Sequence, residues 1–339
     1  MKVFLVGEFS FGALGASYSN AFEKLGHEVF NFDLIKEFNK VSPFSTNRYF
    51  NRLFGRLFYP VINKILLDKV KQNKPDLVFI IKGNYIFPET LHYIKDKFNT
   101  KLYCFNPDNP FNLNSAASND FIRKSIPFYD CYFIWGRSLI PELKNAGAQR
   151  VEYLPFAHDP ELHYPVGVLG KEKKIFGSDI AFIGSYDKER EEFLMNLTNY
   201  DLAIWGCGWE KSLKLKRHWK KRHIMGEDFS KVCNASKIIL NHIRTQNGNA
   251  HNMKTFEIPA CGGFVVTKRT EEQCEFFKEN EDILCFSNVD ELKSIINHYL
   301  AENKLRVEIA QSAYNKVRQH TYLERAKRVM DIFSLMDKA

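Results

Sequence analysis

Glu257 is a single acid in an otherwise apolar or small segment, FEIPACGG. The surrounding stretch predicts a short helix, a stop at Gly262 and Gly263, and a buried strand over residues 264–266. A carboxylate at such a junction is costly to bury unless a polar partner meets it. A ribose diol is a suitable partner, because a carboxylate can accept two hydrogen bonds from hydroxyl groups. We therefore predict that Glu257 binds a ribose.

A second group of residues has the side chains and backbone that bind phosphate. Gly184 and Ser185 follow a predicted buried strand and precede a predicted helix, so backbone N–H groups and the positive end of a helix dipole are available there. Arg190 can add charge-assisted hydrogen bonds to a diphosphate. Gly206 ends another predicted strand and indicates a further close approach of backbone to ligand.

Four residues in the first half of the chain are candidates for a second site. Lys82 and Asn84 follow a predicted buried strand, and strand ends in open α/β sheets face the ligand crevice. Asp108 follows the next predicted strand, where it either forms an Asx turn or serves as a general base for a hydroxyl group. Gly12 lies in the loop after the first predicted strand, and either a position facing this site or a plain tight turn explains a glycine there equally well.

The order of strands and helices predicts a two-domain α/β protein. A chain of 339 residues is long enough for two domains of ordinary size. The boundary is expected near residues 160–175, because a segment rich in Pro and His is followed by a Gly- and Lys-rich run, 166–178, that is expected to be loose. The predicted domains are residues 1–165 and 175–320, followed by a helix over 321–339.

Three local signals predict where helices begin or break. Ser138 and Asp228 are expected to cap helices that end near Asn145 and Ser236. Pro60 is expected to break or kink the amphipathic pattern that surrounds it.

The net charge of +8 at pH 7 suits a phosphate-bearing ligand or an anionic surface. Two basic segments, residues 48–56 and 211–223, are either solvated surface or contacts with lipid headgroups or a polyanionic acceptor. No nucleic-acid motif accompanies them, so no nucleic-acid partner is expected. Seven scattered cysteines without zinc spacing are typical of reduced thiols in a cytosolic protein, and no apolar run has the length of a membrane span. We predict a cytoplasmic protein, with peripheral contact at the inner membrane face as an alternative.

The segment FEIPACGG, the acids that follow it and the terminal HTYLERAKRVM resemble the CgeB or spore-maturation type of glycosyltransferase, a relative of the GT-B enzymes with a group 1-like C-terminal domain. The resemblance is strongest over residues 175–330 and looser over 1–160. It includes an F-x-G-S pattern followed by an arginine, met by Phe182, Gly184, Ser185 and Arg190. It implies two Rossmann-like, doubly wound domains facing a cleft, with the C-terminal helix crossing back to the first domain.

The resemblance also implies a function and a division of the site residues. The expected reaction is transfer of a sugar from a nucleotide-diphosphate sugar to a glycan, protein or lipid-linked acceptor in bacterial cell-surface glycan synthesis, without a metal or other cofactor. Asp108 would be the base, Arg190 and Lys254 would act on the leaving group, and Gly12, Lys82 and Asn84 would face the acceptor. The donor would bind Gly184, Ser185, Arg190, Gly206, Ile224, Asn252, Lys254 and Glu257.

Two departures from the family pattern leave alternatives open. Asn249 occupies the position of the first acid in the Glu-x7-Glu pattern of many retaining GT-B enzymes, and Lys254 replaces an arginine. The stereochemical outcome therefore stays open, as do the sugar, base, acceptor and oligomeric state. The alternatives are a non-catalytic sugar-nucleotide or glycan-binding module and a sugar-nucleotide epimerase of the same architecture. An NAD-dependent dehydrogenase is less favoured, because the first loop lacks its G-x-G-x-x-G spacing.

Overall fold

The computed structural model describes residues 1–43, 54–112 and 118–337. The chain forms two compact units, each with its own parallel sheet. The first unit comprises Met1–Pro155 together with Tyr322–Ala339, and the second comprises Phe156–Thr321. The C-terminal segment therefore belongs to the first unit although it follows the second in the sequence.

The first unit is built on a parallel sheet with the strand order β2-β1-β3-β4-β5-β6. Almost every residue of β1 and β3 to β5 is buried, which explains their continuous apolar sequences, since a parallel sheet is covered on both faces. The strands are β1 (Lys2–Gly7), β2 (Glu28–Asp33), β3 (Leu77–Ile81), β4 (Lys101–Asn106), β5 (Cys131–Ile134) and β6 (Val151–Tyr153).

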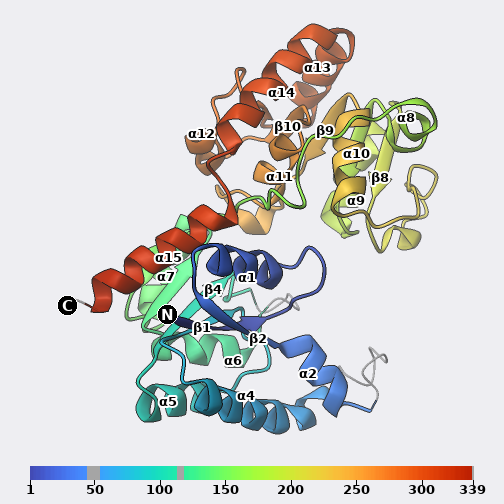
Figure 1. Ribbon diagram of the computed structural model, residues 1–339. Coiled ribbons are helices and arrows are strands. Elements are labelled where there is room, and N and C mark those ends of the chain that lie inside the picture. Colours follow the sequence, from blue (N-terminus) through green and yellow to red (C-terminus); the bar gives the residue numbers. More distant parts are fainter. Residues whose placement is uncertain (44–53, 113–117, 338–339) are drawn as a thin grey trace. The chain divides into compact units, whose positions relative to one another are not determined.

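The C-terminal helix α15 (Tyr322–Asp337) packs beside α1 (Leu14–Lys24) in the first unit (Figure 1). Tyr18 of α1 is fully buried, with its ring centroid 5.3 Å from that of Tyr322 and 5.4 Å from that of Phe79 on β3. This packing confirms that the terminal helix returns to the first domain. The other helices of the unit are α2 (Leu34–Val41), α4 (Tyr59–Asn73), α5 (Pro88–Lys97), α6 (Asp120–Ser125) and α7 (Ile140–Asn145).

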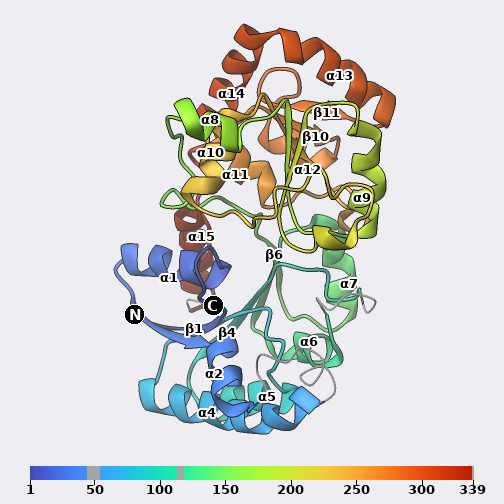
Figure 2. The same cartoon turned by 90° about the vertical axis from the view of Figure 1, so that its right-hand side faces the viewer.

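The second unit is built on a parallel sheet with the strand order β11-β10-β9-β7-β8. Strands β10 and β11 of this sheet are labelled in Figure 2. The strands are β7 (Ile180–Ile183), β8 (Leu202–Trp205), β9 (Ile238–Asn241), β10 (Val265–Lys268) and β11 (Leu284–Phe286). The helices are α8 (Gly170–Phe176), α9 (Lys188–Leu194), α10 (Glu227–Ala235), α11 (Lys254–Ala260), α12 (Glu271–Phe276), α13 (Val289–Ala301) and α14 (Asn303–Val317). Two parallel α/β sheets are what the sequence predicts.

Several local predictions are wrong, each for a physical reason. Pro60 does not break a helix but lies in the first turn of α4, where its missing N–H would have had no partner in any case. Ser138 lies within a 3-10 turn, Arg137–Leu139, and Asp228 lies in the first turn of α10 after Gly226, so neither residue is the cap. The run expected to be loose contains α8, which buries Phe176.

The basic segment 211–223 is a loop that runs along the free edge of the second sheet. The Ile204 N–H of β8 donates to the His218 carbonyl, and the Lys220 N–H donates to the Ile204 carbonyl, both at 2.9 Å. The segment therefore covers backbone groups that an edge strand would otherwise expose. Of the other basic segment, Arg48 and Arg52 lie outside the described residues. No helix within 1–43, 54–112 and 118–337 has the length and apolar content needed to cross a membrane.

Candidate functional site

The carboxyl ends of β7 and β8 bring Gly184 and Gly206 against each other. Gly206 has φ +140°, and a Cβ atom on it would lie 2.2 Å from the Gly184 carbonyl oxygen. The Trp209 indole N–H donates to the Gly184 carbonyl at 2.8 Å, and that of Trp219 donates to the Gly206 carbonyl at 2.9 Å. Both turns therefore have a fixed backbone without a side chain at the edge of the sheet where ligands of open α/β folds bind.

Arg190 lies at the same edge in a cluster with Asp187 and Arg244. Asp187 caps α9 by accepting the Arg190 N–H at 2.8 Å. The Arg190 guanidinium donates to the Ser185 carbonyl at 2.7 Å, and its Nε lies 3.4 Å from Asp187 Oδ2. Arg244 Nη1 lies 3.7 Å from the same oxygen. Burial lowers the pKa of Arg190, although the Asp187 and Glu189 carboxylates oppose that change. The Arg190 and Arg244 guanidiniums both approach Asp187 Oδ2.

Asn252 fixes the start of α11 to the end of β9. Its side-chain oxygen accepts the Thr255 N–H at 3.2 Å, and its Nδ2 donates to Asn241 Oδ1 at 2.8 Å. The Thr255 hydroxyl donates to Gln273 on α12 at 2.9 Å. These bonds position the first turn of α11, which carries Lys254.

Glu257 is 3 % exposed and lies in a group of charged and titratable side chains. Lys254 Nζ donates to Glu257 Oε2 at 2.5 Å, and His163 Nε2 lies 3.9 Å from Glu257 Oε1. The same ammonium lies 4.4 Å from the ring centroid of Phe229, in a cation–π geometry. Burial raises the pKa of Glu257, but Lys254 and His163 outweigh burial and lower it overall. The carboxylate is therefore ionised and carries its own cation.

In the first unit, two predicted residues form an ion pair at the carboxyl ends of adjacent strands. Lys82 follows β3 and Asp108 follows β4, and Lys82 Nζ lies 2.6 Å from Asp108 Oδ2. Lys82 adopts a left-handed conformation with φ +69°, an uncommon one for a residue with a side chain. The Asx turns of this loop come from Asn106 and Asn109, whose side chains accept the N–H groups of Asp108 and Phe111. The Asp108 side chain is therefore available for a role other than the turn.

The remaining predicted residues are placed as follows. Asn84 has a buried side-chain oxygen that accepts no hydrogen bond from the described residues, and its carbonyl accepts the Asn119 side chain at 3.0 Å. Gly12 has φ +78° in the turn after β1, and Ser185 is exposed. The side chain of Ile224 is 4 % exposed, so only its backbone could meet a ligand.

The structure thus forms two groups in the second unit and one in the first. Gly184, Ser185, Arg190 and Gly206 form the first group, and Asn252, Lys254 and Glu257 form the second. Sequence reasoning missed His163, Asp187 and Arg244, and it expected His251 to be a loop histidine without a role. A cap signal three residues before Arg190 could have identified Asp187. His251 is fully buried, with Nδ1 2.9 Å from Glu272 and Nε2 accepting the Phe156 N–H.

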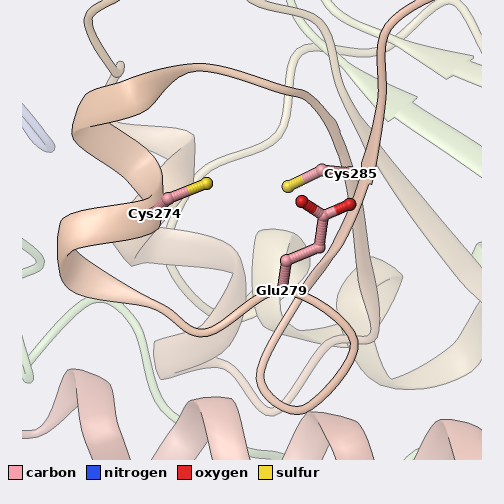
Figure 3. A group of neighbouring side chains, drawn as sticks. All are labelled: Cys274, Glu279 and Cys285. Atoms are coloured by element: carbon pink, nitrogen blue, oxygen red, sulfur yellow. The ribbon is translucent and has the colours of Figure 1, made fainter.

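Three side chains with atoms that ligate metals converge between α12 and β11 (Figure 3). Their ligand atoms all lie within 4.8 Å of one another. They are Cys274, Glu279 and Cys285.

Comparisons with known proteins agree with this architecture. Residues 189–331 match the family model described as Glycosyl transferase-like. Sucrose-phosphate synthase from Thermosynechococcus elongatus is 11% identical with a TM-score of 0.73, over 100% of this chain and 99% of that chain. Trehalose-6-phosphate synthase OtsA is 13% identical with a TM-score of 0.68, over 98% and 99% of the two chains. Anabaena HepE in complex with UDP-glucose is 12% identical with a TM-score of 0.65, over 98% and 99%.

No curated protein matches this chain. The matches to solved structures extend over almost the whole chain at low identity, so they establish the fold. The protein therefore has the GT-B fold of two parallel Rossmann-like sheets with a C-terminal helix against α1, and its residues 189–331 match the glycosyl transferase-like family model.

Proposed function

We propose that the protein is a glycosyltransferase that moves a sugar from a nucleotide-diphosphate sugar to a glycan, protein or lipid-linked acceptor without a metal. The observation that carries the proposal is the ion pair between the buried Glu257 and the partly exposed Lys254, which lies inside the segment that matches the glycosyl transferase-like model. A carboxylate suits the ribose of a nucleotide, and a neighbouring ammonium suits its diphosphate. HepE, which has a similar fold, was solved with UDP-glucose, so a UDP-sugar is the first donor to test.

When the donor binds, Glu257 and Lys254 would exchange each other for the ribose and the diphosphate. The Glu257 side chain is 4% exposed and that of Lys254 is 30% exposed, so solvent reaches the lysine much more than the glutamate. Ribose hydroxyls would reach Glu257 Oε2 when the ammonium leaves it, and the ammonium would then bind the diphosphate. His163 stays beside the other carboxylate oxygen. The exchange never leaves the buried carboxylate without a partner, which would be strongly unfavourable.

The arginine cluster would stabilise the leaving group. During transfer, the bond between the sugar C1 and the diphosphate oxygen breaks, and negative charge accumulates on that oxygen. Arg190 and Arg244 both approach Asp187, and their guanidinium N–H groups can stabilise the departing diphosphate. The Ser185 backbone beside them adds a further contact.

The Lys82–Asp108 pair would serve the acceptor in an inverting transfer. The Asp108 carboxylate would take the proton of the acceptor hydroxyl as its oxygen bonds to the sugar C1. Lys82 donates to the same carboxylate and would orient it. The Asn84 side-chain oxygen, which has no hydrogen-bond partner among the described residues, and the Gly12 turn would contribute to acceptor binding.

The finer assignments are also proposals. Membership of the CgeB or spore-maturation type rests on FEIPACGG and the terminal HTYLERAKRVM, and a place in bacterial cell-surface glycan synthesis follows from that resemblance. A cytoplasmic location, with peripheral contact at the inner membrane face through the lysines of segment 211–223, is consistent with the exposure of that segment.

The direct test is to incubate the protein with a panel of nucleotide sugars and acceptors and to measure both nucleotide diphosphate release and sugar transfer. We expect release coupled to transfer, at a rate that EDTA does not change. Binding of a nucleotide sugar without any release would refute catalysis. Release with a rearranged or free sugar and no acceptor product would indicate an epimerase or hydrolase.

One observation favours a non-catalytic binding module as the second candidate. Asn249 is exposed, and it occupies the position at which many retaining enzymes of this architecture have their first acid. An amide there cannot act as a carboxylate towards the donor sugar. Replacing Asn249 by Glu would raise transfer activity if the missing acid limits the reaction, and would leave a pure binder inactive.

A further inference from the structure

We propose that Cys274, Glu279 and Cys285 form a binding site for a thiophilic divalent cation such as Zn²⁺, separate from the donor site. Cys274 comes from α12, Cys285 from β11, and Glu279 from the loop between them (Figure 3). The two sulfur atoms point toward each other, and the Glu279 carboxylate lies beside the Cys285 sulfur. Two thiolates and a carboxylate are ordinary zinc ligands.

The distances permit a tetrahedral site after a small movement. With Zn–S bonds of about 2.3 Å, two sulfur ligands of a tetrahedral zinc lie roughly 3.8 Å apart. The ligand atoms here lie within 4.8 Å of one another, so they need to close by at most about 1 Å. Cys285 is buried and fixed on its strand, whereas Cys274 is exposed on a short helix and can move. The three donors leave a fourth position for water.

The surrounding charges suit a divalent cation. Arg269 Nη2 donates to Glu279 Oε1 at 2.6 Å and to Glu291 Oε1 at 2.7 Å, so two carboxylates share one guanidinium with a local charge of −1. Binding of Zn²⁺ would form two Zn–S bonds and release two thiol protons to solvent. The local charge would therefore remain −1 after binding.

Arg269 also holds the carboxylate ligand in place. Its Nε donates to Glu279 Oε2 at 3.0 Å, and its Nη2 donates to the Cys285 carbonyl at 3.0 Å. Outer partners of this kind orient the ligands of metal sites. A cysteine binds a metal as its thiolate, so protons and metal compete for the Cys285 sulfur and metal affinity should increase with pH.

A cation here would tie α12 to β11, and α12 supports the donor site. Gln273 on α12 accepts the hydroxyls of Thr255 on α11 and of Thr267 on β10. Glu272 on the same helix bonds to His251. The metal would therefore have a structural role and take no part in sugar transfer.

The test uses the full chain, reduced and stripped of metal with a chelator. Zn²⁺ alone is titrated against a competing chromophoric chelator, and Co²⁺ is added separately to detect a thiolate charge-transfer band. We expect about one equivalent of Zn²⁺ per chain and a rise in Tm of on the order of 5 °C at saturating metal. Cys274→Ser should weaken binding by more than about tenfold, and Glu279→Gln should also weaken it. Cys207→Ser, which changes another exposed cysteine, should leave Zn²⁺ affinity unchanged.

Two outcomes would overturn the site. One is equal Zn²⁺ uptake, or none, by the wild type and Cys274→Ser. The other is a Cys274–Cys285 disulfide in the untreated protein, seen as a mass loss of two hydrogen atoms, together with no Zn²⁺ binding after reduction. The second outcome would identify the two cysteines as a thiol pair without a metal function. Cys274 is exposed, so its serine variant should fold and keep the test decisive.

Discussion

Replacement of Glu257 by Gln separates a ligand-binding role of this carboxylate from a structural one. The amide keeps the volume of the side chain but loses the charge that Lys254 neutralises at 2.5 Å. Breaking a fully buried ion pair costs about 3–5 kcal/mol. Because the Lys254 side chain is 30% exposed, its ammonium can reach water, and we expect a smaller loss of folding free energy, about 1–2 kcal/mol.

Nucleotide binding should fall by more than stability alone explains. A carboxylate that accepts two ribose hydroxyls makes stronger hydrogen bonds than an amide, and loss of about 1–3 kcal/mol corresponds to roughly 5- to 150-fold weaker binding. Isothermal titration calorimetry with UDP measures this change, and urea unfolding measures stability in the same samples.

A matched set of variants gives the control. Lys254→Met removes the cation, and the double variant Lys254→Met with Glu257→Gln completes a thermodynamic cycle. The double variant should recover part of the folding free energy, because no lone charge remains, but should still bind UDP weakly. If Glu257→Gln lowers stability and leaves the UDP dissociation constant unchanged, the carboxylate only neutralises Lys254 and the ribose role is wrong.

Three further predictions concern the turns, the buried histidines and the first unit. Gly206→Ala should destabilise the protein by more than about 3 kcal/mol in thermal or urea unfolding, because its Cβ would meet the Gly184 carbonyl oxygen at 2.2 Å. Gly248→Ala is the control, since Gly248 also has a positive φ but no atom lies within 4 Å of its Cβ position, and it should cost about 1 kcal/mol. Equal costs for the two substitutions would contradict the reasoning. Burial lowers the pKa of His158 to about 4 from 6.5, so the folded state binds fewer protons and stability falls as pH decreases from about 6.5 to 4, by about 2 kcal/mol at pH 5. His158→Gln should flatten this pH dependence in urea unfolding, and an unchanged slope would show that other groups cause it. Asp108→Asn should lower kcat for transfer at least about 100-fold while leaving UDP affinity unchanged, and an active Asp108→Asn enzyme would exclude Asp108 as the base.

The sequence by itself determined the main elements, because they depend on local patterns. Continuous apolar runs identified strands such as Leu77–Ile81, Ile180–Ile183 and Leu202–Trp205, which parallel sheets bury on both faces. The glycines at strand ends also marked real close approaches, as the contact between Gly184 and Gly206 shows. Helix starts were less certain, because Ser138 and Asp228 are residue types that often cap helices, but neither of them is a helix cap in the structure.

Only the tertiary structure decided which side chains meet. His163 lies 94 positions before Glu257 in the sequence (257 − 163). Nothing local to either residue predicts that His163 Nε2 lies 3.9 Å from Glu257 Oε1. The Lys82–Asp108 pair and the Cys274, Glu279 and Cys285 group likewise join separate elements, so their spacing matches no motif. The physical reason is that secondary structure follows from periodicity within about ten residues, whereas the neighbours of a charge depend on the order in which strands are placed in the sheet.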